Sequence, residues 1–260
     1  MRKQDVKQNL YSVKIVIYRV RMTRTFKVAP ARRPGAGAAA RTAPKSMARG
    51  VKSGARPAPY HHGDLHDALL AAAERVLERE GLAGLTLRAV AREAGVSHAA
   101  PTHHFGDLTG VVSELAAIGF RQFNAAMRVA DSDGGTLAER AMSRAKAYVA
   151  YAQAHPGMYG LMFRAERLDM TRPSLSEAAK ASFAGLAGAI GAQRQETIST
   201  EALSLDQAAA IARAWSLVHG FTMLLLDGRL SDILRRLPEG TDAATLLDVM
   251  LRTSVVRPLP

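Results

Sequence analysis

The chain has 260 residues, of which 48% are hydrophobic and 22% are charged, and it contains no cysteine. This composition is typical of a globular protein with one large domain or two small ones. The lack of cysteine excludes disulfide frameworks, thiolate zinc sites and thiol catalysis. The formal net charge is +12, but residues 1–59 carry 15 Lys and Arg against one acid, so most of the excess charge lies in this basic tail.

The basic tail, residues 1–59, is predicted to be disordered. Residues 29–59 are mainly Ala, Arg, Gly and Pro without a hydrophobic period, so they cannot bury enough surface to offset the entropy of ordering. Met22 and Met47 both precede the first globular residue, and we favour an over-extended reading frame. The alternative is a basic arm that adds phosphate contacts to DNA binding.

No apolar run approaches the roughly 18 residues that a membrane span needs. The longest candidate near the start, residues 13–20, is interrupted by Lys14 and Arg19. We therefore expect a protein without a membrane partner.

From Asp64 onward the apolar residues follow helical spacing. Asp64 is expected to cap a helix over about residues 64–80 that stops at Gly81. Three further capping residues follow, each before a helical pattern, and glycines end the first two of these helices. These helices are predicted to start at Thr86 and end at Gly95, to start at Ser97 and end at Gly106, and to start at Asp107 and continue past Met127.

Capping boxes, in which a Ser or Thr precedes Glu or Gln by three residues, open the later helices. They predict helices from Thr136 (with Glu139) to just before Pro156, from Ser174 (with Glu177) to about Gln195, and from Ser204 (with Gln207) to Asp227. A last helix is expected after Thr241. Because no alternating apolar segment occurs outside the tail, the sequence predicts an all-α fold.

The Gly95-Val96-Ser97 segment between two short helices predicts a helix-turn-helix motif. The glycine permits the tight turn and the serine is expected to cap the helix that enters the major groove. Side chains on the outer face of residues 98–104 could then reach base edges. The candidates are His98, Ala99, Thr102 and His103.

The chain resembles the TetR family, and the resemblance rests on several segments. They are Tyr60-His61-His62-Gly63-Asp64-Leu65, Thr86-Leu87-Arg88-Ala89-Val90-Ala91, Gly95-Val96-Ser97 and His103-His104-Phe105. Two later segments resemble the branch named for a Trp-His-Gly signature. They are His155-Pro156-Gly157-Met158-Tyr159-Gly160-Leu161-Met162-Phe163 and Trp215-Ser216-Leu217-Val218-His219-Gly220.

The resemblance implies a three-helix DNA-binding domain over residues 60–106 and a helical regulatory and dimerisation domain over residues 107–260. It implies a bacterial, cytoplasmic, nucleoid-associated regulator, usually a repressor. Such a protein binds a palindromic double-stranded DNA operator as a homodimer, through about residues 205–252 here, and responds to a small-molecule effector.

The resemblance and the motif together give the expected DNA-binding residues. They are Tyr60, His61, His62, Thr86, Ser97, His98, Ala99, Thr102, His103 and His104. Thr102 and Leu108 depart from the Tyr and Lys that are common in the family, which implies a weaker grip on the phosphates. Pro101 lies early in the recognition helix, so this helix is expected to be short or to begin irregularly.

The histidine cluster leaves a second interpretation open. His62 and His66 have the i, i+4 spacing of a helical metal pair, which would make the protein a metal-responsive regulator. We favour no metal and no cofactor, because Asp64 is expected to cap the helix and leave His62 outside it. Phosphate contacts are the favoured role of these histidines.

Aromatic, Met and Arg side chains in the second half could line an effector pocket, although side chains of these types are more often simply core. They are Tyr148, Tyr151, Met158, Tyr159, Met162, Phe163, Arg164, Trp215 and His219. The expected role of His219 with Trp215 is packing, with the imidazole satisfied by a backbone or hydroxyl partner.

An enzyme is not expected, because the sequence has no phosphate-binding glycine loop, nucleophile elbow or paired catalytic signature. A third possible function is that of a non-specific nucleic-acid or membrane-surface binder, which would act through the basic tail. That alternative predicts loss of binding when residues 1–46 are removed.

Overall fold

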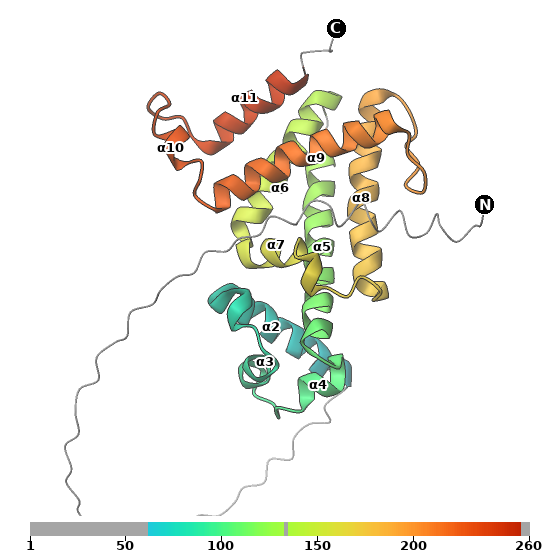
Figure 1. Cartoon of the computed structure of the whole chain (residues 1–260), viewed down its shortest axis with the longest axis vertical. Coiled ribbons are helices and arrows are strands. Elements are labelled where there is room, and N and C mark those ends of the chain that lie inside the picture. Colours follow the sequence, from blue (N-terminus) through green and yellow to red (C-terminus); the bar gives the residue numbers. More distant parts are fainter. Residues whose placement is uncertain (1–61, 133–134, 256–260) are drawn as a thin grey trace, which may run out of the picture. The chain divides into compact units, whose positions relative to one another are not determined.

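The computed structural model describes residues 62–132 and 135–255, and every regular element in these ranges is a helix, as the sequence predicts (Figure 1). The basic tail, Tyr60 and His61 lie outside the described residues. In chain order the helices are α2 (His62–Gly84), α3 (Leu87–Ala94), α4 (Ala100–Phe105), α5 (Leu108–Ser132), α6 (Leu137–Ala154), α7 (Pro156–Met162), the 3-10 helix η2 (Ala165–Arg167), α8 (Pro173–Arg194), α9 (Leu205–Leu226), α10 (Ser231–Leu234) and α11 (Ala243–Val255).

Helices α2, α3 and α4 pack around one apolar core. Leu69, Val76 and Leu77 of α2 and Val90 of α3 are fully buried, because their helical spacing places them on the facing stripes of the two helices. The α2 backbone leaves helical geometry at Gly81 (φ 68°), where the sequence predicts the end of the helix, before a further turn runs to Gly84.

Three predicted helix caps are wrong. Helix α2 begins at His62, so Asp64 lies inside its first turn and His62 is not left outside the helix. Helix α8 begins at Pro173 without a side-chain cap, because a proline at the first helical position has the φ of a helix already. Ser174 consequently lies within α8. Ser97 does not cap α4, which begins at Ala100.

Helix α5 connects the three amino-terminal helices to the rest of the fold (Figure 1). Its first turns pack on α2 and α4, and its later turns pack between α6, α7 and α8. The fully buried residues Val111, Leu115 and Ala116 supply its inner face. Asp107 caps this helix as predicted, since its carboxylate accepts a hydrogen bond from the Gly110 amide at 2.8 Å.

A smaller core forms where α6, α9 and α11 meet. It contains Val149, Phe221, Leu230 and Leu247, all buried. The capping box at Ser204 that opens α9 is present as predicted, and so is the one at Thr136 that opens α6.

Helix α9 is more apolar than expected, since the sequence predicts no segment that could span a membrane. An 18-residue window of Leu205–Leu226 reaches a mean hydropathy of 1.4 and is only 22% buried, so by length and composition this helix could cross a membrane. The expectation that no such segment exists is therefore corrected. Its alanines and leucines keep the mean hydropathy high although Asp206 and Arg213 interrupt the run.

Candidate functional site

A helix-turn-helix occupies residues 86–105. The Thr86 hydroxyl caps α3 by accepting a hydrogen bond from the Ala89 amide at 3.1 Å. Gly95 ends α3 in the left-handed conformation, with φ 70°, which glycine adopts without steric cost. The chain then turns directly into α4.

Helix α4 is short and begins irregularly, as Pro101 predicts. The Ala100 amide donates to the Ser97 carbonyl in the preceding turn at 3.0 Å, and Pro101 lies in the first helical turn. Its missing N–H costs little there, because the first amides of a helix have no partner within it. Pro101 and Phe105 are buried and hold α4 to the core.

The opposite face of α4 and the turn before it are exposed. The predicted base-reading residues all lie on this surface, and so does Ser97. They are His98, Ala99, Thr102 and His103. The structure thus brings the four predicted base-reading residues together, on α4 and the turn before it, and a helix of this kind could enter a major groove.

His104 lies on a different side of α4 and is half-buried. Its ring centroid lies 6.3 Å from that of His66 on α2 and 6.2 Å from that of Phe105. The His66 ring also packs on Phe105, at 4.8 Å, and its Nδ1 atom lies 3.1 Å from the Asp67 carboxylate. These contacts give His66 and His104 a packing role beside the recognition helix.

Tyr60, His61 and His62 are the remaining candidates at the amino-terminal end. His62 belongs to the first turn of α2, and its side chain lies outside the described residues. Within residues 62–132 and 135–255, no group of three His, Asp or Glu side chains is arranged to hold a metal ion.

Helices α2 and α3 are joined by a charged cluster. Glu93 accepts hydrogen bonds from Arg75 at 2.8 Å and from Arg79 at 2.9 Å. These hydrogen bonds lower the pKa of the Glu93 carboxyl. The cluster fixes the position of α3 relative to α2, although solvent screens the attraction between its charges.

In the carboxy-terminal helices, five predicted pocket residues form one cluster around His219. The His219 Nδ1 atom lies 2.9 Å from the Tyr148 hydroxyl and 2.7 Å from the Tyr159 hydroxyl. The Tyr159 hydroxyl donates to that of Tyr148 at 3.1 Å. The Phe163 ring lies 4.8 Å from the imidazole, and the Trp215 ring lies 6.0 Å from it.

His219 has the hydroxyl partners that the sequence predicts, and its environment favours the neutral form. Burial lowers the pKa of His219, because a charged imidazolium loses hydration there. A neutral ring with its proton on Nε2 can accept a hydroxyl proton at Nδ1. The cluster therefore combines apolar rings with polar atoms that are already paired.

The other four predicted pocket residues do not join this cluster. The Tyr151 hydroxyl donates to the Gly119 carbonyl at 3.0 Å, and Met158 and Met162 are buried against α5 beside Gly119. Arg164 is exposed and faces Glu166 at 4.0 Å. Three of these four residues therefore lie in the core, and Arg164 lies on the surface.

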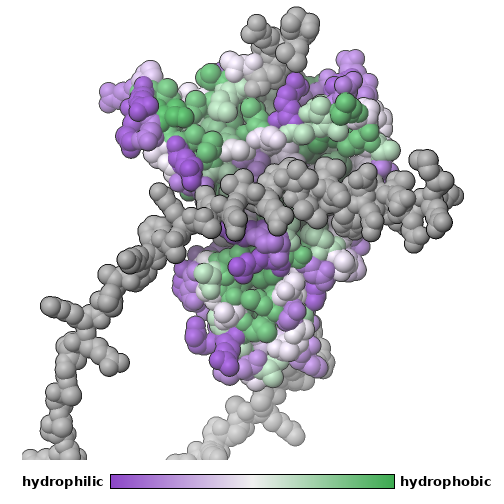
Figure 2. Space-filling view, in the orientation of Figure 1, coloured by the Kyte–Doolittle hydropathy of each residue, from purple (hydrophilic) through white to green (hydrophobic). Residues whose placement is uncertain are grey.

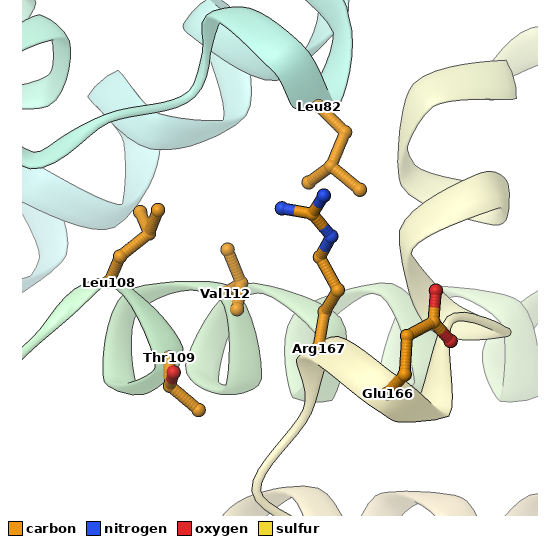
Figure 3. Close-up of a pocket in the computed structure, with 6 residues that line it drawn as sticks. All are labelled: Leu82, Leu108, Thr109, Val112, Glu166 and Arg167. Carbon is orange, nitrogen blue, oxygen red and sulfur yellow. The ribbon is translucent and has the colours of Figure 1, made fainter.

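A cavity of about 280 Å³ lies elsewhere, between the end of α2, the start of α5 and η2 (Figure 3). Leu82, Leu108, Thr109, Val112, Glu166 and Arg167 line it. In Figure 3 the Arg167 side chain extends from η2 toward Leu82. No local sequence pattern predicts this cavity, because its walls come from three separate segments.

Two family models match the chain. The model described as "Bacterial regulatory proteins, tetR family" matches residues 69–115, and the one described as "Tetracyclin repressor-like, C-terminal domain" matches residues 140–253. The first covers the helix-turn-helix, and the second covers the His219 cluster. No curated protein matches the chain.

Solved structures share the fold. A protein of unknown function from Rhodococcus sp. RHA1 is 32% identical with a TM-score of 0.61, over 75% of this chain and 95% of that one. FadR from Bacillus subtilis in complex with stearoyl-CoA is 17% identical with a TM-score of 0.54, over 74% of this chain and 98% of that one. A candidate tetR family transcription regulator from Shewanella sp. PV-4 is 17% identical with a TM-score of 0.53, over 73% of this chain and 97% of that one.

Proposed function

This chain belongs to the tetR family of bacterial regulatory proteins, and from that premise we propose that it is a repressor that binds a palindromic operator as a homodimer and responds to a small molecule. It is a DNA-binding transcriptional regulator and not an enzyme. The observation that carries the proposal is the exposed face of α4, with His98, Thr102 and His103 free of the core. We place the protein in the cytoplasm, on the nucleoid.

DNA contact would combine base recognition with phosphate binding. His103 and Thr102 are the proposed base-reading side chains, because they lie on the exposed face of a helix narrow enough for the major groove. Thr86 lies at the start of α3 and Ser97 in the exposed turn before α4, and hydroxyls and free amides at such positions suit phosphate oxygens. Tyr60, His61 and His62 would extend these backbone contacts.

A homodimer is supported by the apolar surface of the last helices. Leu224 of α9 and Val249 of α11 are each 44% exposed, Trp215 is 39% exposed and Ile233 is 48% exposed. Apolar side chains also gather over this part of the molecule in Figure 2. We propose that a second copy covers this surface, through about residues 205–252. A two-fold dimer would set the two recognition helices about 34 Å apart, one turn of DNA.

The effector site is proposed at the His219 cluster. Tyr148, Tyr159 and His219 offer hydroxyl and imidazole groups beside the apolar Phe163 and Trp215 rings. Pockets with mainly apolar walls and a few polar groups are usual for small ligands. The cluster is packed here, so an effector would have to separate its rings on binding.

The test of the proposal is selection of bound sequences from random duplex DNA at physiological salt. The full chain and a shorter chain of residues 47–260 would be compared. We expect both to enrich the same palindrome, because the helix-turn-helix lies within residues 47–260. If neither enriches a sequence and only the full chain binds, in a salt-sensitive manner, the basic tail is the binding element and the repressor proposal is wrong.

His103→Ala tests the recognition face directly. We expect the variant to lose discrimination at one or two positions of the selected site, with a loss of about tenfold in affinity for the best site. Binding to unrelated DNA should stay nearly the same. Lys180→Ala, on the exposed surface of α8, is the control and should select the wild-type palindrome. Unchanged selection by His103→Ala would remove His103 from the recognition face.

A further inference from the structure

Arg172 reaches from the start of α8 to the end of the recognition helix. Its Nη2 atom donates to the Phe105 carbonyl, the last residue of α4, at 3.0 Å. Its Nη1 atom donates to the Glu114 carboxylate of α5 at 3.4 Å. Asp169 faces its Nε atom at 3.8 Å. One guanidinium thus joins the DNA-binding helices to the segment before α8.

The segment that presents Arg172 is itself held in place. The Asp169 amide donates to the buried Ser113 hydroxyl of α5 at 2.9 Å. The Asp169 carboxylate accepts from the Thr171 amide at 3.0 Å and from the Thr171 hydroxyl at 2.6 Å, and these bonds lower the pKa of Asp169. The Arg172 amide donates to the Asp169 carbonyl at 3.2 Å. This turn, residues 169–172, limits where the arginine can point.

Gly110 leaves the room that the contact needs. A Cβ atom at this position would lie 2.0 Å from the Phe105 carbonyl oxygen and 2.6 Å from Arg172 Nη2. Both are far inside contact distance, so a larger residue would displace the guanidinium, the end of α4 or both. Glycine here therefore serves the close approach of Arg172 to the recognition helix.

We propose that Arg172 is a positioning residue for DNA recognition, which fixes the orientation of α4 by holding the carbonyl at its end. The inference rests on the proposed function, since α4 is the helix that reads the DNA. The last carbonyls of a helix have no partner within it, and a charged donor makes the stronger kind of hydrogen bond to such a group. Helix α4 has only six residues, and this contact at its end adds to the buried Pro101 and Phe105 side chains in aligning it.

Hydrogen exchange of the full chain tests the contact without any DNA. Arg172→Ala should speed exchange of the amides within residues 98–106 by about tenfold relative to wild type, the loss expected for one hydrogen bond to a charged group. The carboxy-terminal helices should exchange as before. Arg128→Ala removes an exposed arginine of α5 and should leave the whole pattern unchanged.

Two milder variants keep the test valid if Arg172→Ala folds poorly. Glu114→Gln removes the charge that orients the guanidinium, and Arg172→Lys keeps the positive charge on a single nitrogen, which cannot make all three contacts. Each should show the same local change in exchange, at a smaller size. Wild-type exchange at residues 98–106 in all folded variants, or faster exchange spread evenly over the whole chain, would overturn the proposal.

The DNA measurement then asks whether the position of α4 matters for recognition. On the selected palindrome, Arg172→Ala should bind about tenfold more weakly, while binding to unrelated DNA at the same salt changes less than twofold. An equal loss on both DNAs would overturn the positioning role. If selection yields no palindrome, the proposed function fails, but the exchange experiment still decides whether Arg172 holds α4.

Discussion

His219 contacts two hydroxyls through a single ring nitrogen, and its burial decides how readily the ring takes up a proton. The Tyr148 and Tyr159 hydroxyls lie within 2.9 Å of its Nδ1 atom, and they are the titratable groups that face it from α6 and α7. Burial lowers the pKa of His219. The folded chain therefore binds a proton at this ring less readily than the unfolded chain does.

This difference predicts how stability depends on pH. Above about pH 6.5, the usual pKa of histidine, His219 is neutral in both the folded and the unfolded state. Its titration then does not change the free energy of unfolding. As the pH falls below that value the unfolded state takes up a proton that the folded state resists, so the free energy of unfolding decreases until the lowered pKa is passed. Denaturant unfolding of wild type and His219→Gln at pH 7.5 and 5.5, at one protein concentration, measures the effect.

The expected result is a larger loss of stability between the two pH values in wild type than in His219→Gln. His98→Gln changes an exposed histidine of the turn before α4. This variant should lose as much stability between the two pH values as wild type does. Equal losses in wild type and His219→Gln would show that protonation of His219 does not oppose folding.

At the scale of single elements, the residues at the two ends of α3 determine where this helix begins and ends. Thr86 caps its start, and Gly95 ends it in the left-handed conformation. The eight-residue helix is too short to be stable alone, so it depends on these ends and on the burial of Ala89, Val90 and Ala91. The geometry of the turn into α4 follows from Gly95.

Gly95→Ala tests that turn. A Cβ at Gly95 would meet nothing within 4 Å, so its cost comes from the backbone, where φ is 70°. We expect the free energy of unfolding to fall by about 1 kcal/mol, measured by denaturant titration. Gly188→Ala is the matched control, since its Cβ also meets nothing but its backbone is helical. It should raise stability by up to about 1 kcal/mol, and a similar loss in both variants would contradict the argument.

At the scale of the whole molecule, the exposed apolar surface of α9 supports the proposed dimer. Only 22% of its most apolar window is buried, although its mean hydropathy would suit a membrane. Arg213 and Asp206 interrupt that surface, and the Nδ1 atom of His219 is tied to hydroxyls of α6 and α7. These features favour an interface between two protein chains over lipid contact.

Leu224→Glu is expected to dissociate the proposed dimer. A carboxylate at this position of α9, now 44% exposed, would be buried without a partner at the interface, which should weaken dimerisation by about a hundredfold or more. Sedimentation velocity over a range of micromolar concentrations measures it. Leu137→Glu, on α6 and 40% exposed, should leave the sedimentation unchanged, and a dimeric Leu224→Glu would exclude α9 from the interface.

The all-α fold and most helix boundaries follow from the amino-acid sequence, because they depend on residues close together in the chain. The Thr136 and Ser204 capping boxes each join residues three apart, and Gly95 needs only its own backbone conformation. The same local logic predicted the exposed face of α4. It was wrong at Ser97 and Ser174, where a nearby proline competes with the serine for the start of the helix.

Which of the nine pocket candidates meet depends on how the helices pack together. Tyr148 and Tyr159 reach His219 across 71 and 60 residues of chain, whereas Arg164, beside Phe163 in the sequence, faces solvent. The cavity near Arg167 and the contact of Arg172 with Phe105 likewise join distant segments. Apolar spacing shows that a helix face is buried but not which helix covers it. The covering helix depends on how the whole chain packs.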